Sequence, residues 1–293
     1  MASTISLILE PTKYPRTDPD IIFGKTKPFI NKKRLKEYPK DYNPILEYWE
    51  QMQTGKTLVP KKVYQQYEEI VRWIKEGGYK EWFYSNERAN HVIEFAENYC
   101  CHSKGKMAGK KVVLELWEKA YLASVYGFVD IEGNRKHQRV VLIVGKKNGK
   151  SLLDSIMGNY GLFADGEGGP EIYAVATKKD QAKIVWLEAK RMVNKSPTLK
   201  KRAKPLTHEI ITEFNDGVFK PLASDKDSLD GLNVHVVIMD EWHQWKNGRA
   251  LYDIMADGIT AREQPLIVMT STAGTIREDI FDEIYEEAEI QFN

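Results

Sequence analysis

Three short segments of the chain carry residue types whose spacing suits chemistry on phosphate groups. The first spans residues 140–151, VVLIVGKKNGKS, and ends in Gly149-Lys150-Ser151 after an apolar run. The standard phosphate-binding signature is Gly, four residues, and then Gly-Lys-Ser/Thr. Its first glycine would fall at position 144, which is Val144, and Gly145 follows one residue late. The segment still predicts a strand, a short loop and a helix start, whose N–H groups bind anions.

This loop predicts a nucleotide site in which its residues have separate roles. Lys150 is expected to reach the β- and γ-phosphates, and the Ser151 hydroxyl to ligate Mg²⁺. Taken alone, the stretch also fits a Lys/Gly-rich surface turn between a strand and a helix. The residues expected to contact the nucleotide are Gly145, Lys146, Lys147, Asn148, Gly149, Lys150 and Ser151.

An acid pair follows a second apolar run, because residues 234–239 lead into Asp240-Glu241. In a parallel sheet, both carboxylates emerge at the carboxyl edge, beside the phosphate loop. Successive strand residues point to opposite sides, so we expect the two acids to have different roles. Asp240 would ligate Mg²⁺, and Glu241 would polarise the attacking water as general base. A strand that merely ends in charged residues is the alternative.

The third segment, residues 265–274, is an apolar run that ends in Thr270, Ser271 and Thr272 before a glycine. Small hydroxyl residues at this place can sense the γ-phosphate by hydrogen bonding and couple its loss to movement. Ser, Thr and Gly also simply end strands. Because the loop, the acid pair and the hydroxyl segment occur in this order, the sequence predicts an ATPase that uses ATP and Mg²⁺.

Alternating apolar runs and amphipathic stretches predict the elements that position these segments. Strands buried on both faces are expected at 140–144, 172–176, 234–239 and 266–270. Asn215-Asp-Gly217 predicts a hairpin between 209–214 and 218–222. The expected fold is α/β, a P-loop NTPase of the ASCE type with a mostly parallel sheet flanked by helices. A helical stripe is formed by Ala182, Val185, Trp186, Ala189 and Val193.

The first hundred residues differ from the rest of the chain in composition and in the spacing of their apolar residues. Five prolines among polar residues predict an extended, poorly packed arm over residues 1–40. Apolar residues at helical spacing predict helices between about 44 and 101, with Ser85 as an N-cap. The expected organisation is an arm over 1–40, a helical segment over 41–105 and a P-loop ATPase domain over 106–293.

Bulk composition narrows the class of protein. A hydrophobic content of 42%, a charged content of 29% and a net charge of +1 are ordinary for a soluble globular protein. No apolar run approaches the roughly 18 residues of a membrane span, so no membrane partner is expected. Adjacent Cys100 and Cys101 rarely form a disulfide, which favours a reducing cytoplasm. The six histidines lack metal-ligand spacing, and no structural zinc is expected.

Together the segments resemble the large terminase subunit of tailed bacteriophages. The resemblance rests on KKNGKS at 146–151, on LDGLN at 229–233 leading into MDEWH, and on TSTAG at 270–274. One branch of that family lacks the standard first glycine and carries a basic residue there, here Lys146 or Lys147. Residues 114–121 resemble the family's adenine-side motif, with Trp117 followed by Glu118 where the family usually has Gln. An ionised Glu118 can only accept a hydrogen bond from the adenine amino group.

The resemblance, which runs from about residue 84 to the end, implies a virus-encoded motor that pumps double-stranded DNA into an empty procapsid. Such motors form a homo-oligomeric ring on the portal protein, work with a small terminase subunit and act in the host cytoplasm. For the isolated chain, the alternative of a monomer is left open. A neighbour's arginine completes each ATP site in the family, and Arg191 is preferred here over Arg202 and Arg139. The family's C-terminal nuclease domain and its activity are not expected in this chain.

DNA binding through phosphates would have little sequence preference and a strong salt dependence. A helicase-type nucleic-acid ATPase, which needs a second motor domain, is one alternative to the packaging motor. A non-catalytic DNA-binding scaffold with a degenerate loop is the other. The basic residues considered for DNA contact are Lys178, Lys179, Lys200, Lys201, Arg202 and Lys204.

Overall fold

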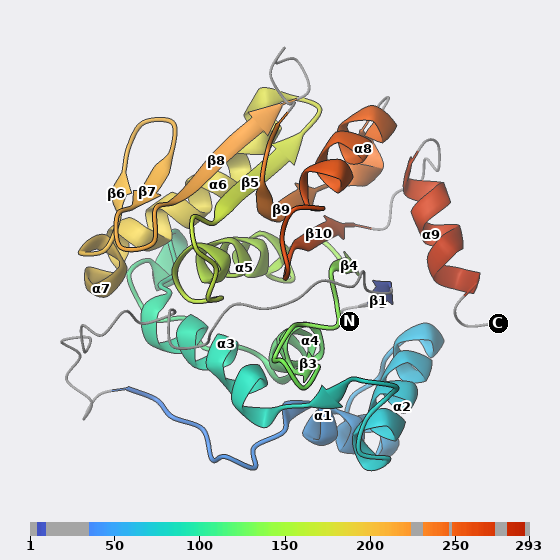
Figure 1. Cartoon of the computed structure of the whole chain (residues 1–293). Coiled ribbons are helices and arrows are strands. Elements are labelled where there is room, and N and C mark those ends of the chain that lie inside the picture. The colour runs from blue at the N-terminus through green and yellow to red at the C-terminus, as the bar shows by residue number, and fades with distance from the viewer. Residues whose placement is uncertain (1–4, 10–34, 224–230, 246–247, 273–279, 291–293) are drawn as a thin grey trace.

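The computed structural model describes residues 5–9, 35–223, 231–245, 248–272 and 280–290. Its main feature is an eight-stranded sheet in the order β1-β4-β10-β9-β5-β8-β7-β6 (Figure 1). The five central strands, from β4 to β8 in that order, run parallel, whereas β1, β7 and β6 pair antiparallel with their neighbours. In sheet order, the strands are β1 Ile5–Leu9, β4 Arg139–Ile143, β10 Leu266–Ser271, β9 Val234–Asp240, β5 Glu171–Ala176, β8 Gly217–Ala223, β7 Ile210–Thr212 and β6 Lys204–Pro205.

The mostly parallel sheet confirms the predicted fold class. Each of the four predicted central strands is present, with its ends shifted by one residue at most. The predicted hairpin is also present, and its turn spans residues 213–216 between β7 and β8. One strand, β10, lies between the strand that leads into the phosphate loop and the strand that ends in the acid pair. This insertion places the third segment directly between the first two.

Alternate residues of the strands enter two separate cores. Val140 and Leu142 of β4 face a large core shared with the N-terminal helices, whereas Val141 and Ile143 face a second core. The large core includes α1 Pro44–Gln53, α2 Lys61–Lys75, α3 Asn86–Tyr99, α4 Leu116–Tyr126, α5 Lys150–Phe163, α6 Lys179–Lys195 and α7 Pro197–Lys200. The second core includes the 3-10 helix η4 Trp242–Gln244, α8 Gly248–Gly258 and α9 Ile280–Ile290.

Helix α5 lies between the N-terminal helices and the strands (Figure 1), and nearly all of its side chains are buried. Its glycines permit this close packing, since a Cβ at Gly161 would lie 2.7 Å from Val236. On the other side, Tyr160 hydrogen-bonds the His91 ring of α3 at 2.8 Å. The predicted stripe on α6 is confirmed, because all five of its residues are buried.

The N-terminal segment is better packed than the sequence predicted. Ile5–Leu9 forms β1, which pairs antiparallel with β4, although the proline-rich composition predicted an arm without sheet pairing. Residues 35–40 lie against α3, where the Lys36 N–H donates to Asn98 at 2.7 Å and the Tyr38 hydroxyl to Glu97 at 2.7 Å. These tertiary hydrogen bonds correct the expectation of poor packing for that part of the arm. Residues 10–34 lie outside the described residues.

The predicted helices between residues 44 and 101 are confirmed as α1, α2 and α3, and Ser85 accepts the Arg88 N–H as N-cap. A small two-stranded sheet, β2 Phe83–Tyr84 with β3 Phe128–Val129, and the 3-10 helix η3 Gly105–Met107 complete this region. Helix α4 packs against both α1 and α3. One hydrophobic core contains residues from both sides of position 105 in the sequence. A domain boundary at 105 therefore stays a prediction. No helix in the described part of the chain combines the length and the hydropathy that a membrane crossing needs.

Candidate nucleotide-binding site

The three predicted segments meet at the carboxyl edge of the sheet. Strands β4, β10 and β9 are parallel neighbours whose ends lie close to register, with Thr270 opposite both Leu142 and Asp240. The carboxyl edge of a parallel sheet is the place where ligands bind in this class of fold. The three segments, far apart in the sequence, are thus neighbours at one edge of the sheet, with the third between the first two.

The phosphate loop runs from the end of β4 to the first residue of α5. Val144, at the position of the missing glycine, is buried and still pairs with the sheet through its N–H to the Ser271 carbonyl at 3.0 Å. Gly149 is the N-cap of α5 with φ +82°, a left-handed conformation that favours glycine. The Asn148 side chain donates to the Gly145 carbonyl at 3.0 Å and braces the turn. The turn that leads from β4 into α5 therefore forms without a glycine at position 144.

Lys150 lies between Asp240, the last residue of β9, and Glu241, which follows it. Its Nζ is 2.6 Å from Asp240 Oδ1 and 2.5 Å from Glu241 Oε1. Burial alone would lower the pKa of Lys150, but the charge of Asp240 and hydrogen bonds to both acids raise it. Burial likewise would raise the pKa of Glu241, and the hydrogen bond and charge of Lys150 lower it instead. The cluster is therefore an ammonium held between carboxylates, with Glu241 ionised.

The acid pair differs from the sequence prediction in one respect. We expected Asp240 and Glu241 to point apart, yet both contact the same ammonium. The reason is the backbone of Glu241, which has φ +51° and leaves the pleat of β9 immediately after Asp240. A non-glycine residue in this conformation costs free energy of order 1–3 kcal/mol, and such strained residues cluster at functional sites.

Asp154 is a site residue that the sequence analysis missed. Thr270 Oγ1 lies 2.8 Å from Asp154 Oδ2 and 3.3 Å from Asp240 Oδ1, so the hydroxyl connects α5 to the acid pair. Asp154 is fully buried, and this burial, together with the charge of Asp240, raises its pKa well above the usual value. Asp154 is therefore a buried carboxyl behind the ammonium cluster, connected to it through the Thr270 hydroxyl. Its position four residues after Lys150, on the same face of a helix, was a sequence signal that could have found it.

Glu118 lies against the phosphate loop, while its neighbour Trp117 is half-buried against the large core. A Cβ added at Gly149 would lie 2.8 Å from Glu118 Oε1, so the carboxyl closely approaches the loop. Glu118 also accepts the Glu115 N–H at 2.8 Å in a capping box at the start of α4. Burial raises the pKa of Glu118 to about 7. This carboxyl thus gains or loses its proton near neutral pH.

Replacing Glu118 with Gln is expected to stabilise the protein in a pH-dependent manner. The folded chain holds the Glu118 proton up to about pH 7, against an ordinary pKa of 4.5, so the stability of the parent chain falls as pH rises between these values. The gain in free energy of unfolding for Glu118→Gln should be small at pH 5 and reach about 3 kcal/mol at pH 8. Urea titrations at several pH values measure it. Exposed Glu87→Gln is the control, and a gain that does not change with pH contradicts the prediction.

The three candidate arginines lie away from the phosphate loop of their own chain. Arg191 lies near the end of α6 and pairs with Glu188 at 3.9 Å. Arg202 is over the Phe214 ring, and Arg139 is the first residue of β4, at the opposite edge of the sheet. An arginine that acts on a neighbour's site does not have to approach its own, so the preference for Arg191 stays a prediction.

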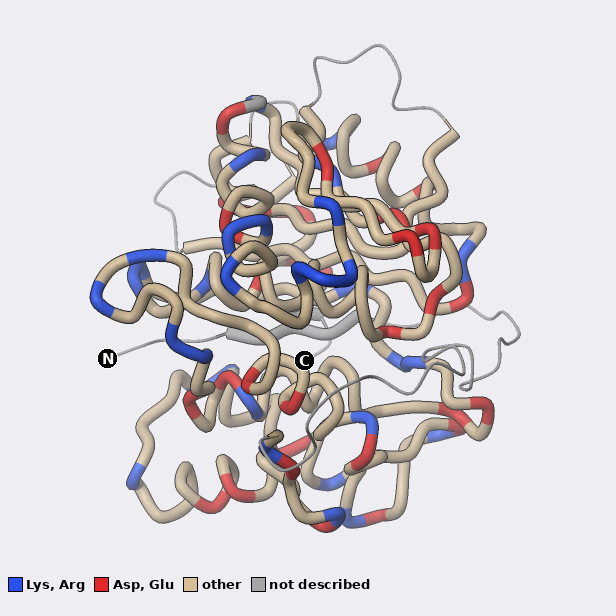
Figure 2. Tube along the Cα trace, turned by 90° about the vertical axis from the view of Figure 1, so that its left-hand side faces the viewer, with Lys and Arg blue, Asp and Glu red and all other residues tan. Residues whose placement is uncertain are grey.

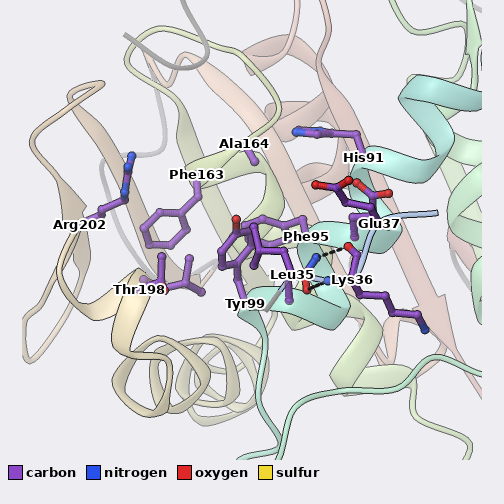
Figure 3. Close-up of a pocket in the computed structure, with 13 residues that line it drawn as sticks. Leu35, Lys36, Glu37, His91, Phe95, Tyr99, Phe163, Ala164, Thr198 and Arg202 are labelled. Atoms are coloured by element: carbon purple, nitrogen blue, oxygen red, sulfur yellow. Dashed lines mark hydrogen bonds between the residues drawn. The ribbon is translucent and has the colours of Figure 1, made fainter. Parts of the chain in front are cut away.

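A cavity of about 220 Å³ lies at the far end of α5, near Phe163. Figure 3 shows Phe95 and Tyr99 of α3 beside it, with Arg202 at its edge. No residue of the phosphate loop and neither acid of β9 lines this cavity. The nucleotide site and the cavity are therefore separate features at the two ends of one helix.

Comparison with known proteins identifies the family. The family model described as "Terminase large subunit, ATPase domain" matches residues 116–290. The chain is 27% identical over 192 residues to the "Terminase, large subunit" of Enterobacteria phage HK97, covering 63% of this chain and 36% of that protein. The crystal structure of the HK97 bacteriophage large terminase has the same fold, with a TM-score of 0.59 at 23% identity over 70% of this chain and 42% of the other.

The chain thus spans about a third of the length of its curated relative. The match to the family model covers more than half of the chain and contains the phosphate loop, the acid pair and the hydroxyl segment. The protein belongs to the family of terminase large subunits and carries the ATPase domain of that family.

Proposed function

We propose that the chain is the ATP-hydrolysing motor domain of a phage packaging machine that drives double-stranded DNA into a procapsid. The observation that supports this most is the cluster of Lys150, Asp240 and Glu241 beside a phosphate loop. Membership of the terminase ATPase family supports nucleotide binding and hydrolysis. The placement of β10 between the loop strand and the acid strand supports a coupling role for Thr270, Ser271 and Thr272.

The donor set fits ATP and Mg²⁺. Hydroxyl and carboxylate oxygens are the ligands that Mg²⁺ prefers, and Ser151 with Asp240 would hold the ion, which neutralises phosphate charge when bound. The N–H groups at the start of α5, with Gly145 to Gly149 before them, would hold the phosphates. Trp117 and Glu118 are proposed to lie beside the adenine, as the resemblance implies. Because Lys150 contacts both acids here, it has to exchange at least one of these ion pairs for a phosphate oxygen.

Glu241 is proposed as the general base. Its carboxylate is ionised, and it lies next to the lysine that would hold the γ-phosphate. A water oxygen attacks the γ-phosphorus while Glu241 takes the water proton, and the bond between the γ-phosphorus and the bridging oxygen breaks. The catalytic contribution of the chain is then positioning and charge neutralisation, as in other phosphoryl transfers. Arg191 is kept as the arginine offered to a neighbouring copy in a ring.

The DNA-facing surface is proposed on the side of the molecule that carries α6 and α7. Lysine and arginine positions gather there in Figure 2. Lys178, Lys200 and Lys201 are exposed, whereas Lys204 pairs with Glu213 and Arg202 is half-buried; the Lys179 side chain lies outside the described residues. The loop over residues 104–111 is joined to α6 by Lys104 and Glu188 at 3.4 Å. It adds four exposed lysines without an acidic residue.

The experiment that tests the proposal is ATP hydrolysis by the purified chain, with and without double-stranded DNA. We expect Mg²⁺-dependent turnover that DNA stimulates, and DNA binding that weakens steeply with salt. A double change of Lys106 and Lys110 to Glu should abolish the stimulation and leave basal turnover intact. Exposed Lys56→Glu with Lys75→Glu is the matched control. Strand separation of a duplex would favour the helicase alternative, and binding of DNA without any turnover would favour the scaffold.

The remaining partners follow from the family resemblance. We propose that the chain acts in the host cytoplasm as a homo-oligomeric ring, docked on a portal protein and supplied with DNA by a small terminase subunit. The HK97 relative is named as a terminase large subunit, which supports a packaging context.

A further inference from the structure

The ring of His243 lies between the proposed general base and the coupling segment. His243 belongs to η4, directly after the acid pair, and only 10% of its side chain is exposed. Its Nδ1 is 2.5 Å from Ser271 Oγ and 3.2 Å from Glu241 Oε2. A single ring nitrogen therefore contacts both the carboxylate of β9 and the end of β10.

The neighbours of His243 determine which ring nitrogen carries the proton. The Ser271 hydroxyl lies 3.1 Å from the Thr272 carbonyl, to which it can donate its one hydrogen, and its oxygen is then an acceptor for His243 Nδ1. On the other side of the ring, Nε2 is 3.3 Å from the side-chain amide nitrogen of Gln244, which can only donate. Both contacts fit a neutral imidazole with its proton on Nδ1. Burial also lowers the pKa of His243 below its usual value, which favours the neutral ring.

This tautomer makes the two oxygens of Glu241 unequal. Oε2 lies 3.2 Å from His243 Nδ1 and accepts from the Thr272 hydroxyl at 3.2 Å. Oε1 faces the Lys150 ammonium. When Lys150 turns toward a phosphate, Oε1 loses that donor while Oε2 keeps both of its own. A carboxylate held by one oxygen presents the other in a fixed direction.

We propose that His243 is a positioning residue for ATP hydrolysis: its Nδ1–H holds Glu241 Oε2 and ties it to Ser271, so that Oε1 accepts the proton of the attacking water. As this proton moves to Oε1, the water oxygen bonds to the γ-phosphorus, and the electron pair of the broken P–O bond leaves on ADP. The role rests on the proposed function, because it acts through Glu241. It also gives the coupling segment a physical connection to the base, through Ser271.

Two matched substitutions test the role of Nδ1. In His243→Asn the amide nitrogen occupies the place of Nδ1, and in His243→Gln it occupies the place of Nε2. We expect His243→Gln to lower kcat about 10- to 100-fold, the range in which misplaced catalytic groups fall, with the Kd for ATP changed less than about threefold. His243→Asn should recover most of the lost turnover. Gln244→Ala, which removes only the partner of Nε2, is the control. Equal losses in both His243 variants at equal thermal stability overturn the proposal, as does an unchanged kcat in His243→Gln.

A second measurement does not depend on turnover. Nitrogen-15 NMR of the histidine rings, with His243 assigned by its absence in His243→Asn, distinguishes the two neutral tautomers and the cation. We expect the Nδ1–H tautomer at pH 7.5. An Nε2–H tautomer or a cation at that pH overturns the inference even in an active enzyme. If the parent chain hydrolyses no ATP, the proposed function fails, and the NMR result separately decides whether His243 makes the hydrogen bonds described.

Discussion

Replacing Glu241 with Gln is expected to lower ATP turnover about 10³-fold and to leave nucleotide binding intact, within the range that general bases contribute. The amide keeps the shape of the side chain and still accepts from Thr272, but it cannot take a proton from water. Binding should be equal or tighter, because Lys150 then loses one of the two carboxylates that compete with phosphate.

Single-turnover kinetics and titration calorimetry separate the two effects. Asp253→Asn is a suitable control, since Asp253 is a half-exposed acid of α8 paired with Arg249. If Glu241→Gln retains turnover, another group is the base, and the inference about His243 fails with it. If it loses binding as well as turnover, Glu241 holds the nucleotide rather than activating water.

The second large effect is expected at Lys150. Lys150→Met should weaken ATP binding at least about 100-fold, because it removes the cation aimed at the phosphates. It should also lower the free energy of unfolding by about 3 kcal/mol, since Asp240 and Glu241 lose a buried counterion. Asp240 is only 8% exposed on its side chain, so water replaces this partner poorly.

A double variant distinguishes these two consequences. Lys150→Met combined with Asp240→Asn should recover stability, because one of the unpaired acids is gone, but it should not recover ATP binding. Urea unfolding and calorimetry on the two variants provide the comparison, and exposed Lys75→Met is the control for loss of a surface charge. Stability unchanged in Lys150→Met would mean that the ammonium does not neutralise the acids in solution.

Much of the sheet could be predicted from sequence because its strands are buried on both faces. The runs around Val140, Ile172 and Leu266 are almost wholly apolar, and the run that begins at Val234 is interrupted only by the buried His235, a composition typical of strands buried on both faces. Strand β1 was missed, because its pairing depends on β4, which lies about 130 residues away in sequence, and no local pattern encodes such a partner. Helices α8 and α9 were also missed, although Leu251, Tyr252 and Met255 have helical spacing.

The sequence predicted that these side chains lie together, but it did not predict how they are connected. Lys150, Asp240, Glu241 and Thr270 lie together as their motif order indicated. The left-handed backbone of Glu241 was not predictable, because the pleat of a strand gives the opposite expectation. The roles of Asp154 and His243 depend on hydrogen bonds to β10 that form only in the folded chain. Motifs supply the reacting groups, and tertiary contacts decide which atoms of those groups are exposed.

The core shared by the N-terminal helices and the sheet has a thermodynamic consequence. Ile45 of α1 and Ile70 of α2 pack in the same cluster as Val140 of β4 and Leu153 of α5. Elements that share a core open together, so a ligand that binds only the folded state shifts the opening equilibrium of all of them. Nucleotide at the carboxyl edge should therefore slow amide hydrogen exchange in α1 and α2, by up to RT ln(1 + [L]/Kd) at a free nucleotide concentration [L], although neither helix contributes a residue to the site.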